Sequence, residues 1–185
     1  DQQEDDMRSL VFETTPLDEP IEILGAPVVT LDVASDRPIA NLVVRLCDVH
    51  PSGESLRVSY GVLNLTHREG HEQPTLLTPG ERYRVRIQLN DAGSVFPPGH
   101  KVRLAISTAY WPMIWPSPET ATLLRYAAVV ASAAPPVNQR FALAVTVLEE
   151  RQVEQPKARQ VPPRSVRLNA AEMVEHVAHV ARCVA

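Results

Sequence analysis

The sequence predicts an all-β protein built from antiparallel strands, arranged as a sandwich or a barrel. Polar and aliphatic residues alternate with a period of two in three separate segments. Because a strand points successive side chains to opposite faces, this alternation buries one face of a sheet and leaves the other in water. Short apolar runs punctuated by Pro and Gly turns fill the space between these segments. No segment before residue 169 has helical periodicity, and the predicted strands leave no stretch long enough for the helices that an α/β fold requires, so the sequence excludes that fold.

The predicted strands follow one another closely along the chain. The alternating segments are 84–89, 101–107 and 140–147. Further strands are predicted at 10–12, 21–24, 28–33, 42–49, 56–65 and 124–131. The turns 51–53, 78–80 and 97–99 each contain Pro and end in Gly. Since Pro sets φ near −65° and Gly adopts positive φ, these segments are typical of tight turns between strands.

The chain changes character after residue 148, so we predict one domain over residues 1–148 and two extensions. Residues 149–168 are polar with three prolines and are predicted to form an extended arm. Residues 169–185 are a tail with a predicted short amphipathic helix. Asn169 and Glu172 resemble an N-terminal capping pair. The apolar residues that follow at helical spacing are Met173, Val177, Val180 and Val184.

Composition excludes several classes of protein. With 44% apolar residues among 185, the chain is not largely disordered, and no run of 18 apolar residues predicts a membrane span. The net charge of −4 comes from four N-terminal acids, Asp1, Glu4, Asp5 and Asp6. The other residues carry equal numbers of acidic and basic side chains, so the chain has no excess of positive charge for binding nucleic acid or a membrane surface. No signal peptide is visible, which predicts a cytoplasmic protein. The start at Asp1, without Met, leads us to expect a piece of a longer protein.

The residues that could carry chemistry form no recognisable catalytic motif. Seven scattered glycines include neither a G-x-S-x-G nucleophile elbow nor a phosphate-binding loop, and Ser55 is expected to lie in a turn. Cys47 and Cys183 are 136 positions apart and are expected to be free thiols in a reducing compartment. We therefore expect no cofactor, no metal site and no catalytic residue in this chain.

The histidines do not change this expectation. His67 and His71 could meet only across a helix, and their segment contains Gly70 and lies between predicted strands. His176 and His179 are expected on a solvated helix face. His100 follows a Pro-Gly turn and is expected to hydrogen-bond a neighbouring loop.

The least ordinary stretch is 110–119, which holds both tryptophans and three prolines. Proline removes ladder donors, so this segment is predicted to be a rigid loop after a strand. Aromatic residues on a stiff loop provide a large contact area at low entropic cost. The tryptophans could fill the domain's own core, dock on a neighbouring domain, or stack on a sugar or other ligand. The candidate contact residues are Tyr110, Trp111, Met113 and Trp115.

An ordered series of short motifs runs along residues 1 to about 148. The motifs are Asp1-Gln2 with Arg8-Ser9-Leu10-Val11-Phe12, Pro16-Leu17 with Ile21-Glu22-Ile23-Leu24-Gly25-Ala26-Pro27, Val33-Ala34-Ser35-Asp36, Val44-Arg45-Leu46-Cys47-Asp48-Val49-His50-Pro51-Ser52-Gly53, Gly61-Val62-Leu63, His67-Arg68-Glu69, Leu77-Thr78-Pro79-Gly80-Glu81-Arg82-Tyr83 and Val95-Phe96-Pro97-Pro98-Gly99-His100-Lys101-Val102-Arg103-Leu104. In this order and at these spacings, the chain resembles one family, the C-terminal jelly-roll domain of cocaine esterase and X-Pro dipeptidyl-peptidase type serine hydrolases (CocE/NonD hydrolases). The resemblance departs from the esterase pattern after Ser107.

The resemblance implies an antiparallel jelly-roll β-sandwich of the galactose-binding-like type. It also implies a non-catalytic accessory domain that packs on an α/β-hydrolase domain of the same parent chain, which carries the Ser-His-Asp triad. Such a domain would help to shape the active-site mouth or an oligomer, and a homo-oligomer remains open. The parent would cleave ester or amide bonds, and this chain alone would be inactive. A carbohydrate-binding or other ligand-binding β-sandwich module is the alternative function, because the same architecture hosts lectin-like sites.

Overall fold

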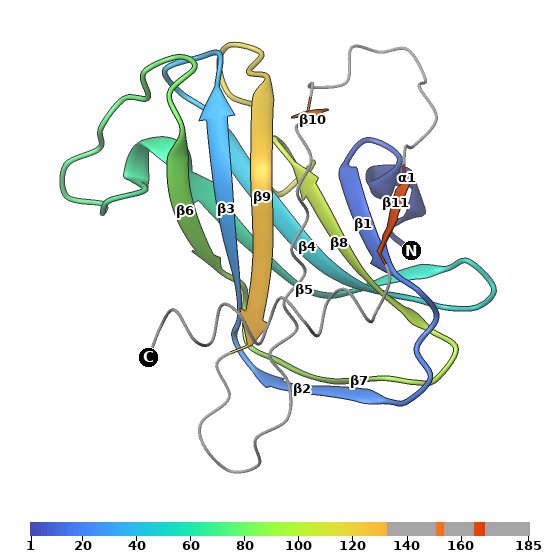
Figure 1. Ribbon diagram of the computed structural model, residues 1–185. Coiled ribbons are helices and arrows are strands. Elements are labelled where there is room, and N and C mark those ends of the chain that lie inside the picture. Colours follow the sequence, from blue (N-terminus) through green and yellow to red (C-terminus); the bar gives the residue numbers. More distant parts are fainter. Residues whose placement is uncertain (133–150, 154–164, 169–185) are drawn as a thin grey trace.

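The structure, a computed structural model, describes residues 1–132, 151–153 and 165–168. The described part contains eleven strands and two short helices (Figure 1). They are α1 (Gln3–Asp6), β1 (Leu10–Thr14), β2 (Ile21–Gly25), β3 (Pro27–Ser35), β4 (Asn41–Val49), β5 (Ser55–Asn64), the 3₁₀ helix η1 (Leu65–His67), β6 (Tyr83–Gln88), β7 (Ala92–Phe96), β8 (Lys101–Ser107), β9 (Leu123–Ser132), β10 (Arg151–Val153) and β11 (Ser165–Leu168).

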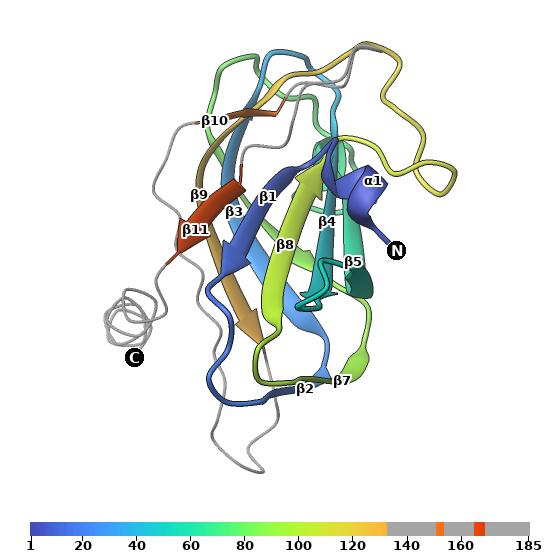
Figure 2. The same ribbon diagram turned by 90° about the vertical axis from the view of Figure 1, so that its right-hand side faces the viewer.

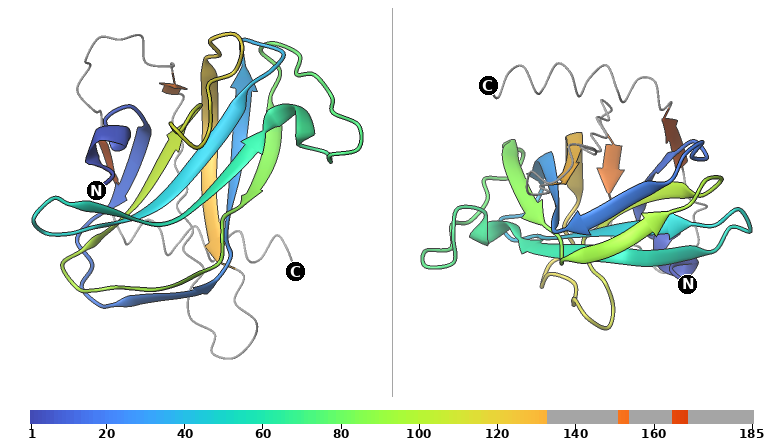
Figure 3. Two further views of the ribbon diagram at one scale, coloured as in Figure 1. Left: turned by 180° about the vertical axis from the view of Figure 1, so that it is seen from behind. Right: turned by 90° about the horizontal axis from the view of Figure 1, so that it is seen from below.

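Two sheets face each other and form a sandwich (Figures 1 and 2). The larger sheet has the order β11-β1-β8-β4-β5, and the smaller has the order β10-β9-β3-β6. A separate two-stranded ribbon, β2-β7, closes one end of the sandwich beneath both sheets (Figure 3). Neighbouring strands are antiparallel except β1 and β11, which pair in parallel. Because the chain crosses repeatedly between the layers, the predicted all-β jelly-roll sandwich is confirmed.

The core lies between the two sheets and follows the period-two pattern of the sequence. On β4, Leu42, Val44 and Leu46 point into it and are each about 1% exposed or less. Val29 and Leu31 of β3 approach from the opposite sheet and are equally buried. Interdigitation of the two inner faces is what stabilises a sandwich of this kind.

Strand predictions made from alternation and apolar runs are confirmed for β1 to β6, β8 and β9. Strand β7 was not predicted, because Ala92, Gly93 and Ser94 are weak strand formers and its pairing with β2 determines its conformation. Helix α1 has only four residues, too few for a periodic signal. Strands β10 and β11 lie inside the stretch predicted as an arm, and each pairs at the edge of a sheet. The predicted strand 140–147 and the predicted C-terminal helix lie outside the described residues.

Part of the outer face of the larger sheet is covered by α1, whose Asp6 contacts β4, β5 and β8 (Figure 2). Strand β4 is therefore buried on both faces, with Val43, Arg45 and Cys47 beneath α1. No helix in the described part of the chain is long and apolar enough to cross a membrane.

Candidate docking surface

The aromatic segment forms a short closed loop directly after β8. The backbone N–H of Tyr110 donates to the carbonyl of Ile114 (2.9 Å), and the N–H of Ile114 donates back to Tyr110 (2.6 Å). Trp111, Pro112 and Met113 occupy the tip, with a cis peptide bond between Trp111 and Pro112. The two hydrogen bonds close the loop on itself, and the predicted loop after a strand is confirmed.

Tyr110 anchors this loop to the sandwich. The side chain is only 6% exposed, unlike the other aromatic residues of the loop. Its hydroxyl accepts a hydrogen bond from Nη1 of Arg57 (2.6 Å) and donates one to Oε1 of Gln2 (2.6 Å). The guanidinium groups of Arg45 and Arg57 lie 5.0 and 5.5 Å from the centre of its ring. A ring held between two cations and two hydrogen bonds has little freedom to move.

The two tryptophans lie on the surface. Trp111 is 63% exposed and Trp115 is 67% exposed, and Met113 beside them is 45% exposed. The indole rings contact each other, with centroids 4.9 Å apart at a tilted angle of 56°. This exposure rules out the reading in which the tryptophans fill the domain's own core. We call Trp111, Met113 and Trp115 the aromatic tip, a rigid apolar projection of the kind found in binding surfaces.

A buried ionic layer lies under α1 and supports the base of the loop. The carboxylate of Asp6 lies 3.1 Å from Nη2 of Arg45, accepts a hydrogen bond from Nη1 of Arg103 (2.7 Å) and accepts another from Oγ of Ser55 (2.7 Å). Arg103 also donates to Glu13 through both Nε (3.0 Å) and Nη2. Arg45 is 1% exposed and donates to Gln2, which in turn accepts from Tyr110. The ionic layer is therefore connected to the aromatic loop through Gln2.

The charges of Glu13 and Arg103 in this layer are stabilised by their neighbours. Burial by itself would raise the pKa of Glu13, but the positive charges and hydrogen bonds of Arg103 and Lys101 outweigh it, so the pKa lies below its usual value. Burial would lower the pKa of Arg103, yet the carboxylates of Asp6 and Glu13 raise it. Sequence reasoning missed this layer, because it counted Asp6 only as one of the N-terminal acids that account for the net charge. The available signal was Arg45, a charge between the apolar residues Val44 and Leu46 of β4.

The histidines partly depart from expectation. His67 and His71 were expected to stay apart, but their Nδ1 atoms are 3.2 Å from each other. The 3₁₀ helix η1 and a turn in which the N–H of Gly70 donates to the carbonyl of His67 bring the chain back on itself. His100 was expected to hydrogen-bond a neighbouring loop, but its Nδ1 makes a 2.8 Å hydrogen bond with Asp48, a residue of strand β4.

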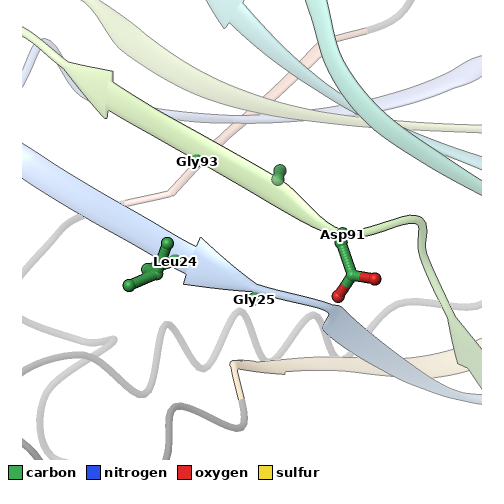
Figure 4. A pocket seen from close by; sticks show the side chains of 5 residues that line it. Leu24, Gly25, Asp91 and Gly93 are labelled. Atoms are coloured by element: carbon green, nitrogen blue, oxygen red, sulfur yellow. The ribbon is translucent and has the colours of Figure 1, made fainter.

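The described residues contain no arrangement for covalent catalysis. No serine hydroxyl in this part of the chain is hydrogen-bonded to a histidine. Cys47 is buried and free, and burial raises the pKa of its thiol to about 11, which keeps it protonated. A shallow depression between β2 and β7 is lined by Leu24, Gly25, Asp91, Ala92 and Gly93 (Figure 4). Asp91 is its only ionisable residue, so it offers no general acid–base pair.

Comparison with known proteins agrees with the lack of a catalytic arrangement in the described residues. Residues 1–153 match the family model described as the X-Pro dipeptidyl-peptidase C-terminal non-catalytic domain. The cocaine esterase of Rhodococcus sp. (strain MB1 Bresler) is 31% identical over 103 residues, which are 56% of this chain and 18% of that protein. None of these names describes a carbohydrate-binding protein.

Two solved structures share the fold. An α-amino acid ester hydrolase superposes with a TM-score of 0.58 at 31% identity, covering 60% of this chain and 20% of that one. An aminopeptidase from the marine sediment archaeon Thaumarchaeota archaeon superposes with a TM-score of 0.61 at 26% identity, covering 64% of this chain and 21% of that one. The matched regions span about a fifth of the length of these relatives.

Proposed function

The chain belongs to the family of X-Pro dipeptidyl-peptidase C-terminal non-catalytic domains, and from that premise we propose that it is the accessory domain of a serine hydrolase that cleaves ester or amide bonds. It docks on the α/β-hydrolase domain of its parent protein and helps to shape the mouth of the active site. The missing nucleophile–histidine pair in the described residues supports a non-catalytic role.

The aromatic tip is the observation that carries the docking proposal. A tryptophan side chain can bury about 150–250 Å², so two indoles that are each about two-thirds exposed leave roughly 200–300 Å² of surface for a partner. The fixed base at Tyr110 means that little conformational entropy is lost when this surface is covered. Truncating a tryptophan at the centre of an interface commonly weakens the binding free energy by about 2 kcal/mol or more, which is about a thirtyfold change in affinity. We place the hydrolase domain against this tip.

The first test asks whether the chain is catalytic. The purified 185-residue chain should hydrolyse a p-nitrophenyl ester no faster than buffer does. Saturable turnover that is lost on treatment with a serine-directed inhibitor would refute the accessory role.

The second test asks where the chain docks. We expect isothermal titration of the parent's separately produced hydrolase domain with this chain to show binding that weakens about thirtyfold or more in Trp111→Ser/Trp115→Ser. The matched control is Leu24→Ser, which removes a 75% exposed apolar side chain from β2 at the opposite end of the sandwich (Figure 2). Equal weakening by both changes, or by neither, would refute docking through the tip. Sedimentation that shows a dimer of this chain, dispersed by the tryptophan substitutions, would instead identify a second copy as the occupant.

A further inference from the structure

A second cluster of chemically capable side chains lies away from the aromatic tip, where three segments meet. Asp48 comes from the end of β4, His50 from the turn between β4 and β5, and His100 from the turn before β8. One ligand atom from each residue lies within 4.8 Å of the other two. The two imidazole rings also contact each other, with centroids 4.3 Å apart. We propose that these three side chains form a site for a divalent transition metal, most suitably Zn²⁺.

The backbone holds all three residues in place. The N–H of His50 donates to Glu54 (2.9 Å), and the carbonyl of His50 accepts from Gly53 (2.9 Å), which closes the turn. The N–H of His100 donates to Pro97 (3.2 Å), and its carbonyl accepts from Leu17 (2.8 Å). Asp48 lies in the paired part of β4. A metal ion would therefore meet ligands whose positions the fold already determines.

The spacing of the ligand atoms suits a small tetrahedral ion. Zn²⁺ bonds of about 2.0–2.1 Å place two ligands of a tetrahedron roughly 3.4 Å apart. The distance from Nδ1 of His100 to Oδ1 of Asp48 is 2.8 Å, and that from Nε2 of His50 to Oδ2 of Asp48 is 3.9 Å. One distance lies below the ideal and one above it. The two distances reach different oxygens of the carboxylate, so a metal bound to one of them needs His100 and Asp48 to separate by about 0.6 Å and the partly exposed His50 to turn toward the same oxygen.

The donor set selects the class of metal. Two imidazoles and one carboxylate suit Zn²⁺, Co²⁺ or Ni²⁺, whereas Ca²⁺ and Mg²⁺ prefer oxygen ligands alone. Asp48 and His100 are about 13–14% exposed, while His50 is 33% exposed and gives access from solvent. Solvent would supply the fourth ligand. Bound metal would tie the β4–β5 turn to the turn before β8, and this role is independent of the docking proposal.

The test uses Co²⁺ as a spectroscopic probe, because tetrahedral Co²⁺ absorbs visible light much more strongly than the octahedral aqueous ion. The full chain carries two further histidine pairs, His67/His71 and His176/His179, so the background variant is His67→Gln/His176→Gln. We expect this variant to bind one equivalent of Co²⁺ with strong visible absorption, which Zn²⁺ displaces. The additional change His50→Gln should weaken binding at least tenfold.

His50 donates no side-chain hydrogen bond in the described structure, so His50→Gln should fold normally, as near-UV circular dichroism would verify. Zn²⁺ should raise the melting temperature of the background variant and leave that of the His50→Gln variant unchanged. Absent or octahedral Co²⁺ absorption in the background variant, or equal binding after His50→Gln, would overturn the proposal.

Discussion

Removing the carboxylate of Asp6 should destabilise the domain far more than its place in an acidic N-terminal segment suggests. The side chain is 4% exposed and contacts two guanidinium groups, on Arg45 and Arg103, at 3.1 and 2.7 Å. Arg45 is 1% exposed, and its other carboxylate neighbour is Asp5 at 4.0 Å, so in Asp6→Ala only Asp5 would face this buried charge. A buried pair broken on one side typically costs 3–5 kcal/mol, because an uncompensated charge remains.

We therefore expect Asp6→Ala to lower the free energy of unfolding by about 4 kcal/mol. For a chain of this size, that change corresponds to a fall in melting temperature of roughly 8–16 °C. The measurement is urea unfolding followed by far-UV circular dichroism, with the melting temperature as a second readout. The m-value should stay constant, so that the midpoint alone reports the change.

Glu4→Ala is the matched control, since Glu4 lies on the same short helix. Its ion pair with Arg8 spans 3.5 Å, but the two side chains are 81% and 62% exposed. Such a pair contributes about 0.2–0.5 kcal/mol at most. If Asp6→Ala and Glu4→Ala differ by less than about 1 kcal/mol, the reasoning is wrong.

A triple replacement separates an orphaned charge from a general packing defect. Asp6→Leu/Arg45→Met/Ser55→Ala removes the carboxylate together with Arg45 and the hydroxyl of Ser55, the buried partners it would leave unpaired, while Arg103 keeps its pairing with Glu13. Buried ionic clusters replaced by apolar residues of similar size are often as stable as the original or more so. We expect the triple variant to recover most of the stability that Asp6→Ala loses. A triple variant as unstable as the single one would show that packing of Asp6, not charge, is responsible.

Three further predictions concern single residues. The carboxylate of Glu13 has a folded pKa below its ordinary value of 4.5, so its stabilising contribution is complete above that pH and is lost as the pH falls through the folded pKa. Urea midpoints should therefore fall on acidification less steeply in Glu13→Gln than in the parent chain, and equal slopes would contradict this. With a thiol pKa of about 11, Cys47 should resist iodoacetamide at pH 8 until urea unfolds the chain. Peptide mass spectrometry would measure the labelling. Labelling of the folded chain at the rate of a free cysteine would refute this prediction. Gly61→Ala should cost about 1–3 kcal/mol, because its new Cβ would lie 2.7 Å from the carbonyl oxygen of Gln88. Gly93→Ala is its control, because its new Cβ would meet Cδ1 of Leu24 at an ordinary 3.8 Å. Equal effects of the two changes on the urea midpoint would contradict the steric argument.

Much of the fold was predictable because its signals are local. Alternation along 101–107 identifies β8 without knowledge of its neighbours, and the Pro-Gly turns mark where strands end. The aromatic loop was predictable for the same reason, since prolines exclude a regular strand whatever surrounds them. The ordered motifs in the sequence also predicted the family to which the chain belongs. Strand β7 escaped prediction, because its conformation depends on β2, about 70 residues earlier in the chain.

By itself, the sequence determined the fold class, most of the strands, the loop that carries both tryptophans and the lack of a nucleophile motif. Only the tertiary structure decided which charges are buried and which aromatic side chains are exposed. Asp6 meets Arg103 across 97 positions, and His50 meets His100 across 50. Periodicity describes which face of a strand a side chain occupies, whereas burial depends on what the fold places over that face. Short helix α1 covers one face of β4, and although Arg45 within β4 signals an ionic partner, the local pattern does not show that α1 supplies it.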